Sequence, residues 1–184
     1  TETIKEALQG AAAVFVRYPC RFGADVIRVS TDVLVISTSG RGTDAIDVAA
    51  ATDCGIAVVN NPGLGSVPVS EHTLGFMLDL AKQIGRSNVE IHQGGGFDQR
   101  YASTRFDLEG RTLGVIGCGE IGTEVVRKCT VGFRMHVLVY DPYIAVSAAE
   151  EVGGTKVESL DELLSVSHFV SVHAELTEET RGMI

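Results

Sequence analysis

Residues 112–122 read TLGVIGCGEIG and join an apolar segment to a glycine-rich turn. The apolar run 112–116 predicts a buried β-strand, and Gly117, Gly119 and Gly122 follow it with the spacing G-x-G-x-x-G. Residues 120–131 then carry apolar side chains at helical spacing. A strand, a glycine turn and a helix in this order are typical of a phosphate-binding βαβ unit, whereas the glycines alone would be weak support.

Each glycine of the motif has a mechanical role. Gly117 permits the tight turn, Gly119 lets the backbone approach a pyrophosphate, and Gly122 lets the helix and strand pack closely. Asp141 lies 19 residues after Gly122, at the end of the next expected strand. Its carboxylate is placed to accept hydrogen bonds from the adenosine ribose and to repel a 2′-phosphate, so the motif predicts NAD rather than NADP. The alternative is a structural turn that holds no cofactor.

The rest of the chain alternates between short apolar runs and helical patterns. Strands are expected at 11–17, 32–37 and 55–59, helices at 3–8 and 45–52, and a longer helix from Ser70 to about Ile84. The triple glycine at 94–96 predicts a domain boundary, with domains at 1–96 and 97–184. After it, strands at 112–116, 135–140 and 169–173 alternate with helices at 120–131 and 160–166. These three strands correspond to half of a six-stranded doubly wound sheet.

Composition excludes several classes of protein. The 184 residues carry 24 acidic against 15 Lys and Arg side chains, a net charge of −9, which argues against a nucleic-acid partner. No apolar run approaches the length of a membrane span, and the first ten residues lack the pattern of a secretory signal, so we expect a cytoplasmic protein. Four widely spaced cysteines and five unpaired histidines favour neither a disulfide framework nor a metal site.

Several ordered motifs resemble one enzyme family. They are LEGRTLGVIGCGEIG at 108–122, YDPY at 140–143, SVHAELTEETRG at 171–182, GRGTDAID at 40–47, GIAVVNNPG at 55–63 and VSEH at 69–72. Together they are similar to the D-isomer-specific 2-hydroxyacid dehydrogenases of the phosphoglycerate dehydrogenase and glyoxylate-hydroxypyruvate reductase type, over nearly the whole chain. The resemblance implies an α/β fold with parallel sheets, in which a flavodoxin-like substrate domain precedes the first half of a Rossmann domain.

The same resemblance implies an NAD-dependent oxidoreductase that moves a hydride between nicotinamide and a small D-2-hydroxy acid or 2-oxo acid. The implied cofactor-binding residues are Gly117, Gly119, Glu120, Ile121, Gly122, Asp141, Pro142, His173, Ala174, Glu175, Thr180 and Val69. Backbone amides near Arg41 and Gly42 are implied to receive the substrate carboxylate. The catalytic Arg, Glu and His of the family are expected beyond Ile184, and its opening strand before Thr1.

Glu120 departs from the family pattern, and a second function fits the same signatures. Glu120 stands where the family usually carries an Arg that helps hold the pyrophosphate, which predicts weakened cofactor binding at this position. The alternative function is a non-catalytic, NAD-sensing protein of the kind represented by the C-terminal-binding-protein corepressors, which share the fold and these signatures. For either function the resemblance implies a homodimer.

Overall fold

The computed structural model describes residues 2–96, 101 and 104–184. The chain forms two compact units, Thr1–Gly65 and Ser66–Ile184, each with its own parallel sheet. The first unit contains α1 (Glu2–Ala7), β1 (Ala13–Val16), α2 (Ala24–Ile27), β2 (Val35–Thr38), α3 (Val48–Asp53) and β3 (Ala57–Val59). The second contains α4 (Ser66–Lys82), α5 (Ile84–His92), β4 (Thr112–Ile116), α6 (Glu120–Phe133), β5 (His136–Tyr140), α7 (Val146–Glu151), β6 (Thr155–Lys156), α8 (Leu160–Val166) and β7 (Phe169–Val172).

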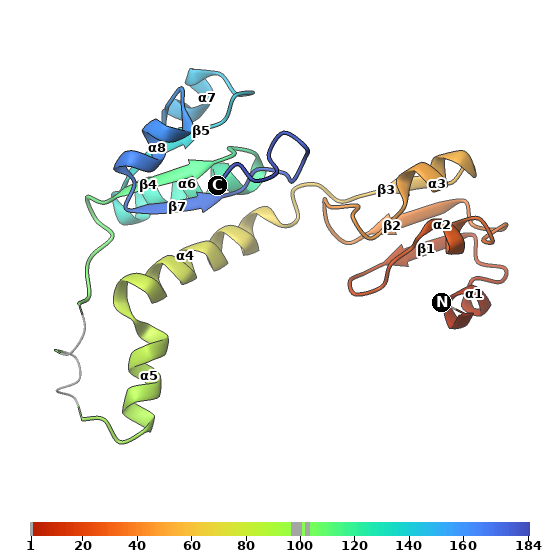
Figure 1. Cartoon of the computed structure of the whole chain (residues 1–184), viewed down its shortest axis with the longest axis horizontal. Helices are drawn as coiled ribbons and strands as arrows, with labels where there is room; N and C mark the ends of the chain where they lie inside the picture. Colours follow the sequence, from red (N-terminus) through yellow and green to blue (C-terminus); the bar gives the residue numbers. More distant parts are fainter. Residues whose placement is uncertain (1, 97–100, 102–103) are drawn as a thin grey trace. The chain divides into compact units, whose positions relative to one another are not determined.

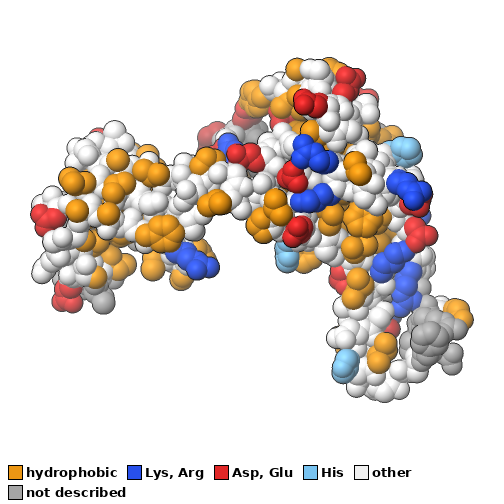
Figure 2. Space-filling model, turned by 180° about the vertical axis from the view of Figure 1, so that it is seen from behind, with side chains coloured by type: hydrophobic (Ala, Val, Ile, Leu, Met, Phe, Trp, Pro, Cys, Tyr) orange, Lys and Arg blue, Asp and Glu red, His pale blue; other side chains and the backbone are white. Residues whose placement is uncertain are grey.

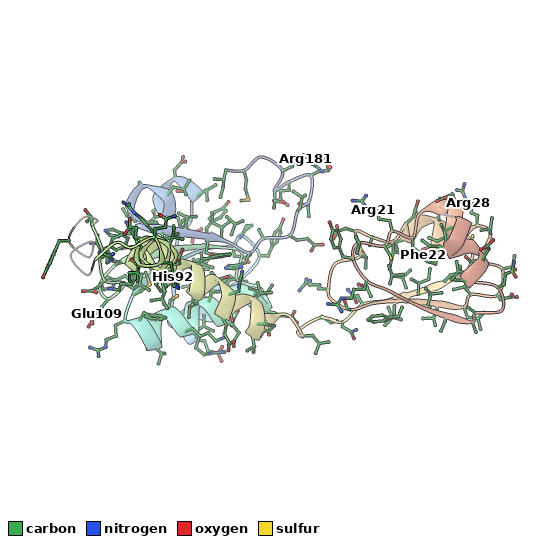
Figure 3. The ribbon with its side chains drawn as sticks, turned by 90° about the horizontal axis from the view of Figure 1, so that it is seen from below. Arg21, Phe22, Arg28, His92, Glu109 and Arg181 are labelled. Carbon is green, nitrogen blue, oxygen red and sulfur yellow. The ribbon has the colours of Figure 1, made fainter. Side chains whose placement is uncertain are left out.

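The first unit is a three-stranded sheet in the order β1-β2-β3. Its core includes Val16, Ile36 and Phe22, and Figure 3 shows Phe22 among the side chains of this unit. Helix α3 begins three residues later than its pattern predicted, because the Asp47 carboxylate caps it by accepting from the amide of Ala50 at 2.9 Å. Apolar side chains are also widely exposed on this unit, as Figure 2 shows on its left side.

The second unit is a four-stranded sheet in the order β6-β5-β4-β7, with α6 and α8 against it (Figure 1). Alternate residues of β4 point to opposite faces. Leu113 and Val115 lie in one apolar cluster with residues of α6, whereas Ile116 lies in another with Leu163 of α8. The unit is therefore a doubly wound α/β layer, as expected, with helices on both faces of the sheet.

The expected count of three strands in this region is wrong. Residues 155 and 156 form the additional strand β6, whose two residues are too few to show a hydrophobic period. In the expected half-sheet the last strand would pair with the outer strand. In the structure β7 pairs with β4 instead. As a result β4 is interior, and the point where the strand order reverses, between β4 and β7, lies within the chain.

Helix α4 belongs to the second unit. It begins at Ser66, four residues before the expected start, and it ends at Lys82, because Gln83 adopts a left-handed conformation with φ of 53°. Its side chains Met77 and Ala81 are buried in the core that also contains α6. The compact units therefore divide after Gly65, earlier than the boundary expected after Gly96, because α4 packs against α6 and shares its apolar cluster.

Candidate functional site

The glycine turn after β4 contacts the chain that leaves β7. Gly117 has a φ of +86°, and its amide donates to the carbonyl oxygen of Tyr140 at 2.9 Å. A Cβ atom on Gly117 would lie 2.6 Å from the amide nitrogen of Ala174, and the amide of His173 donates to Ile116 at 2.7 Å. No side chain fits at Gly117, so the ends of β4, β5 and β7 meet at this turn.

Two glycines at the start of α6 differ in the space that surrounds them. A Cβ on Gly122 would lie 2.1 Å from the carbonyl oxygen of Gly117, so the helix packs directly on the turn. A Cβ on Gly119, the N-cap, would meet no protein atom within 4 Å. Ile121 packs against the core cluster, whereas Glu120 is exposed. The backbone at Gly119 therefore borders open space at the positive end of a 14-residue helix.

Two backbone amides orient the carboxylate of Asp141. The amide of Cys118 donates to Oδ2 at 2.8 Å, and that of Tyr143 donates to Oδ1 at 2.9 Å. Each carboxylate oxygen accepts more than one hydrogen bond, so both retain capacity for a ligand hydroxyl. Pro142, between the two, is exposed. The carboxylate is thus fixed at the end of β5, beside the glycine turn.

The loop after β7 lines a hollow at the same edge of the sheet. A hollow of about 220 Å³ is lined there by Val172, Ala174, Glu175, Thr180 and Met183, among others. The Thr180 hydroxyl donates to the carbonyl of Glu175 at 2.6 Å, which closes the loop on itself. Burial lowers the pKa of His173, whose Nε2 lies 2.9 Å from Oγ of Ser171. His173 is therefore neutral at neutral pH.

These features fit a dinucleotide. Its pyrophosphate is an anion that needs close backbone approach at a helix N-terminus, which the open position at Gly119 provides. Its adenosine ribose needs an acceptor, which Asp141 provides, and its adenine needs a partly apolar hollow, which the loop after β7 provides. The three features lie at the carboxyl ends of adjacent strands, where ligands of open α/β sheets bind.

Val69 lies in the same unit, near the start of α4, and its side chain is partly exposed. The next residue, Ser70, is fully buried and accepts a 2.5 Å hydrogen bond from Nζ of Lys128 on α6. Lys128 also pairs with Glu124 at 3.2 Å. These contacts join the start of α4 to α6, the helix that begins at the glycine turn.

Arg41 and Gly42 lie in the first unit, in the loop that follows β2. The carbonyl of Arg41 accepts from Nδ2 of Asn60 at 2.8 Å, and the amide of Asn61 donates to the carbonyl of Gly40 at 3.0 Å. Nδ2 of Asn61 also donates to the carbonyl of Thr38 at 3.0 Å. The two asparagines after β3 therefore hold the loop through its carbonyl oxygens.

Sequence reasoning did not predict the contacts that Tyr143 makes with Asp141 and Glu179. The spacing of Asp141 and Tyr143, two residues apart, is typical of an Asx turn and is a signal that could have identified the first. The hydroxyl of Tyr143 donates to the carboxylate of Glu179, a contact between residues 36 apart that no local pattern predicts. Within the described residues no cluster of His, Cys, Asp and Glu side chains is suited to a metal ion. Nor is any described helix both long and apolar enough to cross a membrane.

Comparison with known proteins gives a family match over residues 74–184, to the NAD binding domain of the D-isomer specific 2-hydroxyacid dehydrogenases. The chain is 38% identical to D-3-phosphoglycerate dehydrogenase of Methanocaldococcus jannaschii, over 100% of this chain and 34% of that protein. It is 36% identical to hydroxypyruvate reductase of Thermotoga maritima, over 92% of this chain and 53% of that protein.

Solved structures agree with this match. The apo-structure of D-lactate dehydrogenase from Escherichia coli superposes with a TM-score of 0.87 and 31% identity, over 100% of this chain and 57% of that one. The chain therefore spans about a third to a little over half of the length of these relatives.

Proposed function

Since the chain belongs to the D-isomer specific 2-hydroxyacid dehydrogenase family, we propose that it supplies the cofactor site of an NAD-dependent oxidoreductase. The substrate class is a small D-2-hydroxy acid and the corresponding 2-oxo acid. The three relatives named above differ in the acid that their names specify, which supports this class and no single member of it. The substrate domain is proposed to lie in the first compact unit, Thr1–Gly65, and the NAD-binding domain in the second, Ser66–Ile184.

The observation that carries this proposal is the convergence of the glycine turn, the oriented Asp141 carboxylate and the hollow after β7. The bond from Cys118 to Asp141 and the approach of Gly117 to Ala174 bring the ends of three strands together. This is the place where a parallel sheet of this topology binds a dinucleotide.

Each part of the chain then has a defined task. The amides at the start of α6, from Gly119 to Gly122, receive the pyrophosphate, and Asp141 receives the adenosine ribose hydroxyls. Ala174, Glu175 and Thr180 border the adenine, with Pro142 and His173 beside them. Val69 contributes an apolar contact to the nicotinamide. When bound, NAD supplies the hydride acceptor or donor, while the protein orients it and excludes water.

The substrate carboxylate is assigned to the loop at Arg41 and Gly42. The bonds from Asn60 and Asn61 hold this loop by its carbonyl oxygens, and this fixed backbone supports recognition of an anionic ligand by the loop. Backbone recognition tolerates changes of side chain, so Arg41→Ala is expected to weaken substrate binding less than a change that disrupts the loop, such as Asn60→Ala.

Calorimetric titration with ADP-ribose tests the cofactor site, because this probe needs only the adenosine and pyrophosphate subsites. Gly119→Ala introduces a methyl group that meets no protein atom, so the fold is expected to persist while the affinity falls about tenfold through lost pyrophosphate contact. Gly132→Ala, in the same helix and equally free of clashes, is the control and should bind as the unsubstituted chain does. Equal affinities for the two variants would contradict the proposal.

We also propose a cytoplasmic homodimer. The four cysteines are free thiols, which suits a reducing compartment. Phe76 and Leu80, one helical turn apart on α4, are 60% and 65% exposed and offer an apolar contact. Sedimentation of the chain, with Leu80→Asp as a dissociating variant, tests the dimer. A monomer before substitution would refute it.

A further inference from the structure

A single tyrosine holds two carboxylates at the adenosine side of the site. The amide of Tyr143 donates to Oδ1 of Asp141 at 2.9 Å, and its hydroxyl donates to the carboxylate of Glu179. Asp141 follows β5, whereas Glu179 lies in the loop that follows β7. Because opposite ends of one residue bind them, the two carboxylates lie within the span of one tyrosine side chain.

From this bridge we propose that Glu179, held by Tyr143, is a second specificity-determining residue of the adenosine subsite, and that it acts with Asp141 to exclude the 2′-phosphate of NADP. This inference rests on the proposed function, since it concerns the choice between two forms of the same cofactor. In this proposal Asp141 contributes one negative charge at the ribose, and Glu179, joined to it through Tyr143, contributes a second.

The loop around Glu179 is ordered by its own hydrogen bonds. The amide of Thr177 donates to the Thr180 hydroxyl at 2.8 Å, and that hydroxyl donates to the carbonyl of Glu175 at 2.6 Å. Glu175 and Thr180 line the hollow after β7. Glu179 therefore directly precedes a residue of the adenine wall in a closed loop, and its position is set by this loop as well as by Tyr143.

The charges of both carboxylates act at the Tyr143 hydroxyl. The hydrogen bond to Glu179 and its charge raise the pKa of Tyr143 above its usual range, and the charge of Asp141 adds a smaller contribution in the same direction. Tyr143 thus remains a hydrogen-bond donor at neutral pH. A phosphate placed beside the ribose would meet the same two negative charges.

The neighbouring glutamate of the loop provides a matched control. Glu178 pairs with Arg181 at 3.3 Å, and Figure 3 shows Arg181 on the loop after β7. The Glu178 side chain is 92% exposed. Glu178 therefore shares the charge and the loop of Glu179, but its partner is a cation of the same loop, whereas the partner of Glu179 is Tyr143, which follows β5.

The test compares calorimetric affinities for ADP-ribose and 2′-phospho-ADP-ribose in four variants of the chain. Glu179→Gln and Tyr143→Phe are expected to shift the ratio of affinities about threefold or more toward the phosphorylated probe at low salt, while Glu178→Gln leaves it unchanged. Asp141→Asn should shift the ratio in the same direction. Unchanged melting temperatures of the Glu179 and Glu178 variants would establish that the fold is intact.

Each outcome decides between the hypotheses. A shift with Asp141→Asn but none with Glu179→Gln would overturn the role of Glu179 and leave the proposed cofactor site standing. Equal shifts with Glu178→Gln and Glu179→Gln would also overturn it, because a general effect of loop charge would then suffice. If the unsubstituted chain binds neither probe, the proposed function itself is refuted and this inference with it.

Discussion

The amide of Cys118 donates a 2.8 Å hydrogen bond to Oδ2 of Asp141, a residue 23 positions further along the chain. The glycine turn after β4 and the carboxylate after β5 are therefore joined by a bond of the protein itself. Asp141, proposed to bind the ribose, thus also holds the turn that is proposed to receive the pyrophosphate, so one hydrogen bond joins the two proposed subsites.

This coupling predicts that Asp141→Ala destabilises the chain even without cofactor. The amides of Cys118 and Tyr143 both lose their acceptor, and such losses at a charged partner typically cost about 1–3 kcal/mol. Urea denaturation of the unsubstituted chain and of Asp141→Ala measures the difference in their free energies of unfolding. Asp141→Asn, which keeps one acceptor oxygen, should lose less. An unchanged midpoint for Asp141→Ala would show that the bond contributes nothing to the fold.

Gly122 and Gly132 lie in the same helix but differ in their surroundings. Gly122→Ala is expected to destabilise the chain by roughly 1–3 kcal/mol, because its Cβ would lie 2.1 Å from the carbonyl oxygen of Gly117 and the backbone must shift. Gly132→Ala meets no atom within 4 Å and should be neutral or slightly stabilising, since alanine favours a helix. Thermal unfolding of both variants is the measurement. Similar melting temperatures would contradict the packing argument.

The thiols are predicted to differ in reactivity and in their effect on stability. Cys20 and Cys54 are exposed, whereas burial raises the pKa of Cys118 and raises that of Cys129 to about 12. Alkylation near pH 8 should therefore modify the exposed pair first, as read by mass spectrometry. Rapid labelling of Cys118 would indicate an open glycine turn.

Cys129 is also expected to make the free energy of unfolding depend on pH. Above the ordinary thiol pKa of 9.0 the unfolded chain loses this proton while the folded chain keeps it up to about pH 12. The contribution to stability is thus complete below pH 9.0 and is lost as the pH rises, at a limit of about 1.4 kcal/mol per pH unit. Cys129→Ala should lower stability at neutral pH but remove this part of the slope. If the stability of the unsubstituted chain and of Cys129→Ala falls in parallel above pH 9.0, Cys129 does not cause the pH dependence.

His173 predicts the opposite dependence in the acid range. Burial lowers its pKa below the usual value of 6.5, so the unfolded chain takes up this proton first as the pH falls. Stability is therefore lost as the pH decreases below 6.5, and His173→Gln should flatten this part of the curve. Urea midpoints from about pH 5 to pH 8 measure the effect. If His173→Gln keeps the full pH dependence, the loss of stability in acid is caused by other groups.

Local sequence was sufficient for much of the second unit. The strand at 112–116, the glycine turn and the start of the next helix were predicted with their bounds, because hydrophobic period and turn chemistry are properties of adjacent residues. The same holds for Gly117, whose positive φ follows from the tight turn. The prediction for α4 was less accurate, since its start at Ser66 and its end at Lys82, before the left-handed Gln83, carry no simple pattern.

Contacts between segments distant in the chain could not be predicted from local patterns. The order β6-β5-β4-β7 and the approach of Gly117 to Ala174 arise from pairing between segments distant in the chain, which local patterning does not encode. The bridge from Asp141 through Tyr143 to Glu179 depends on the same placement. The helices and strands, the glycine turn and the family resemblance therefore follow from local patterns of residues. Long-range packing determined that β4 is interior, that α4 joins the second unit, and that two carboxylates share one tyrosine.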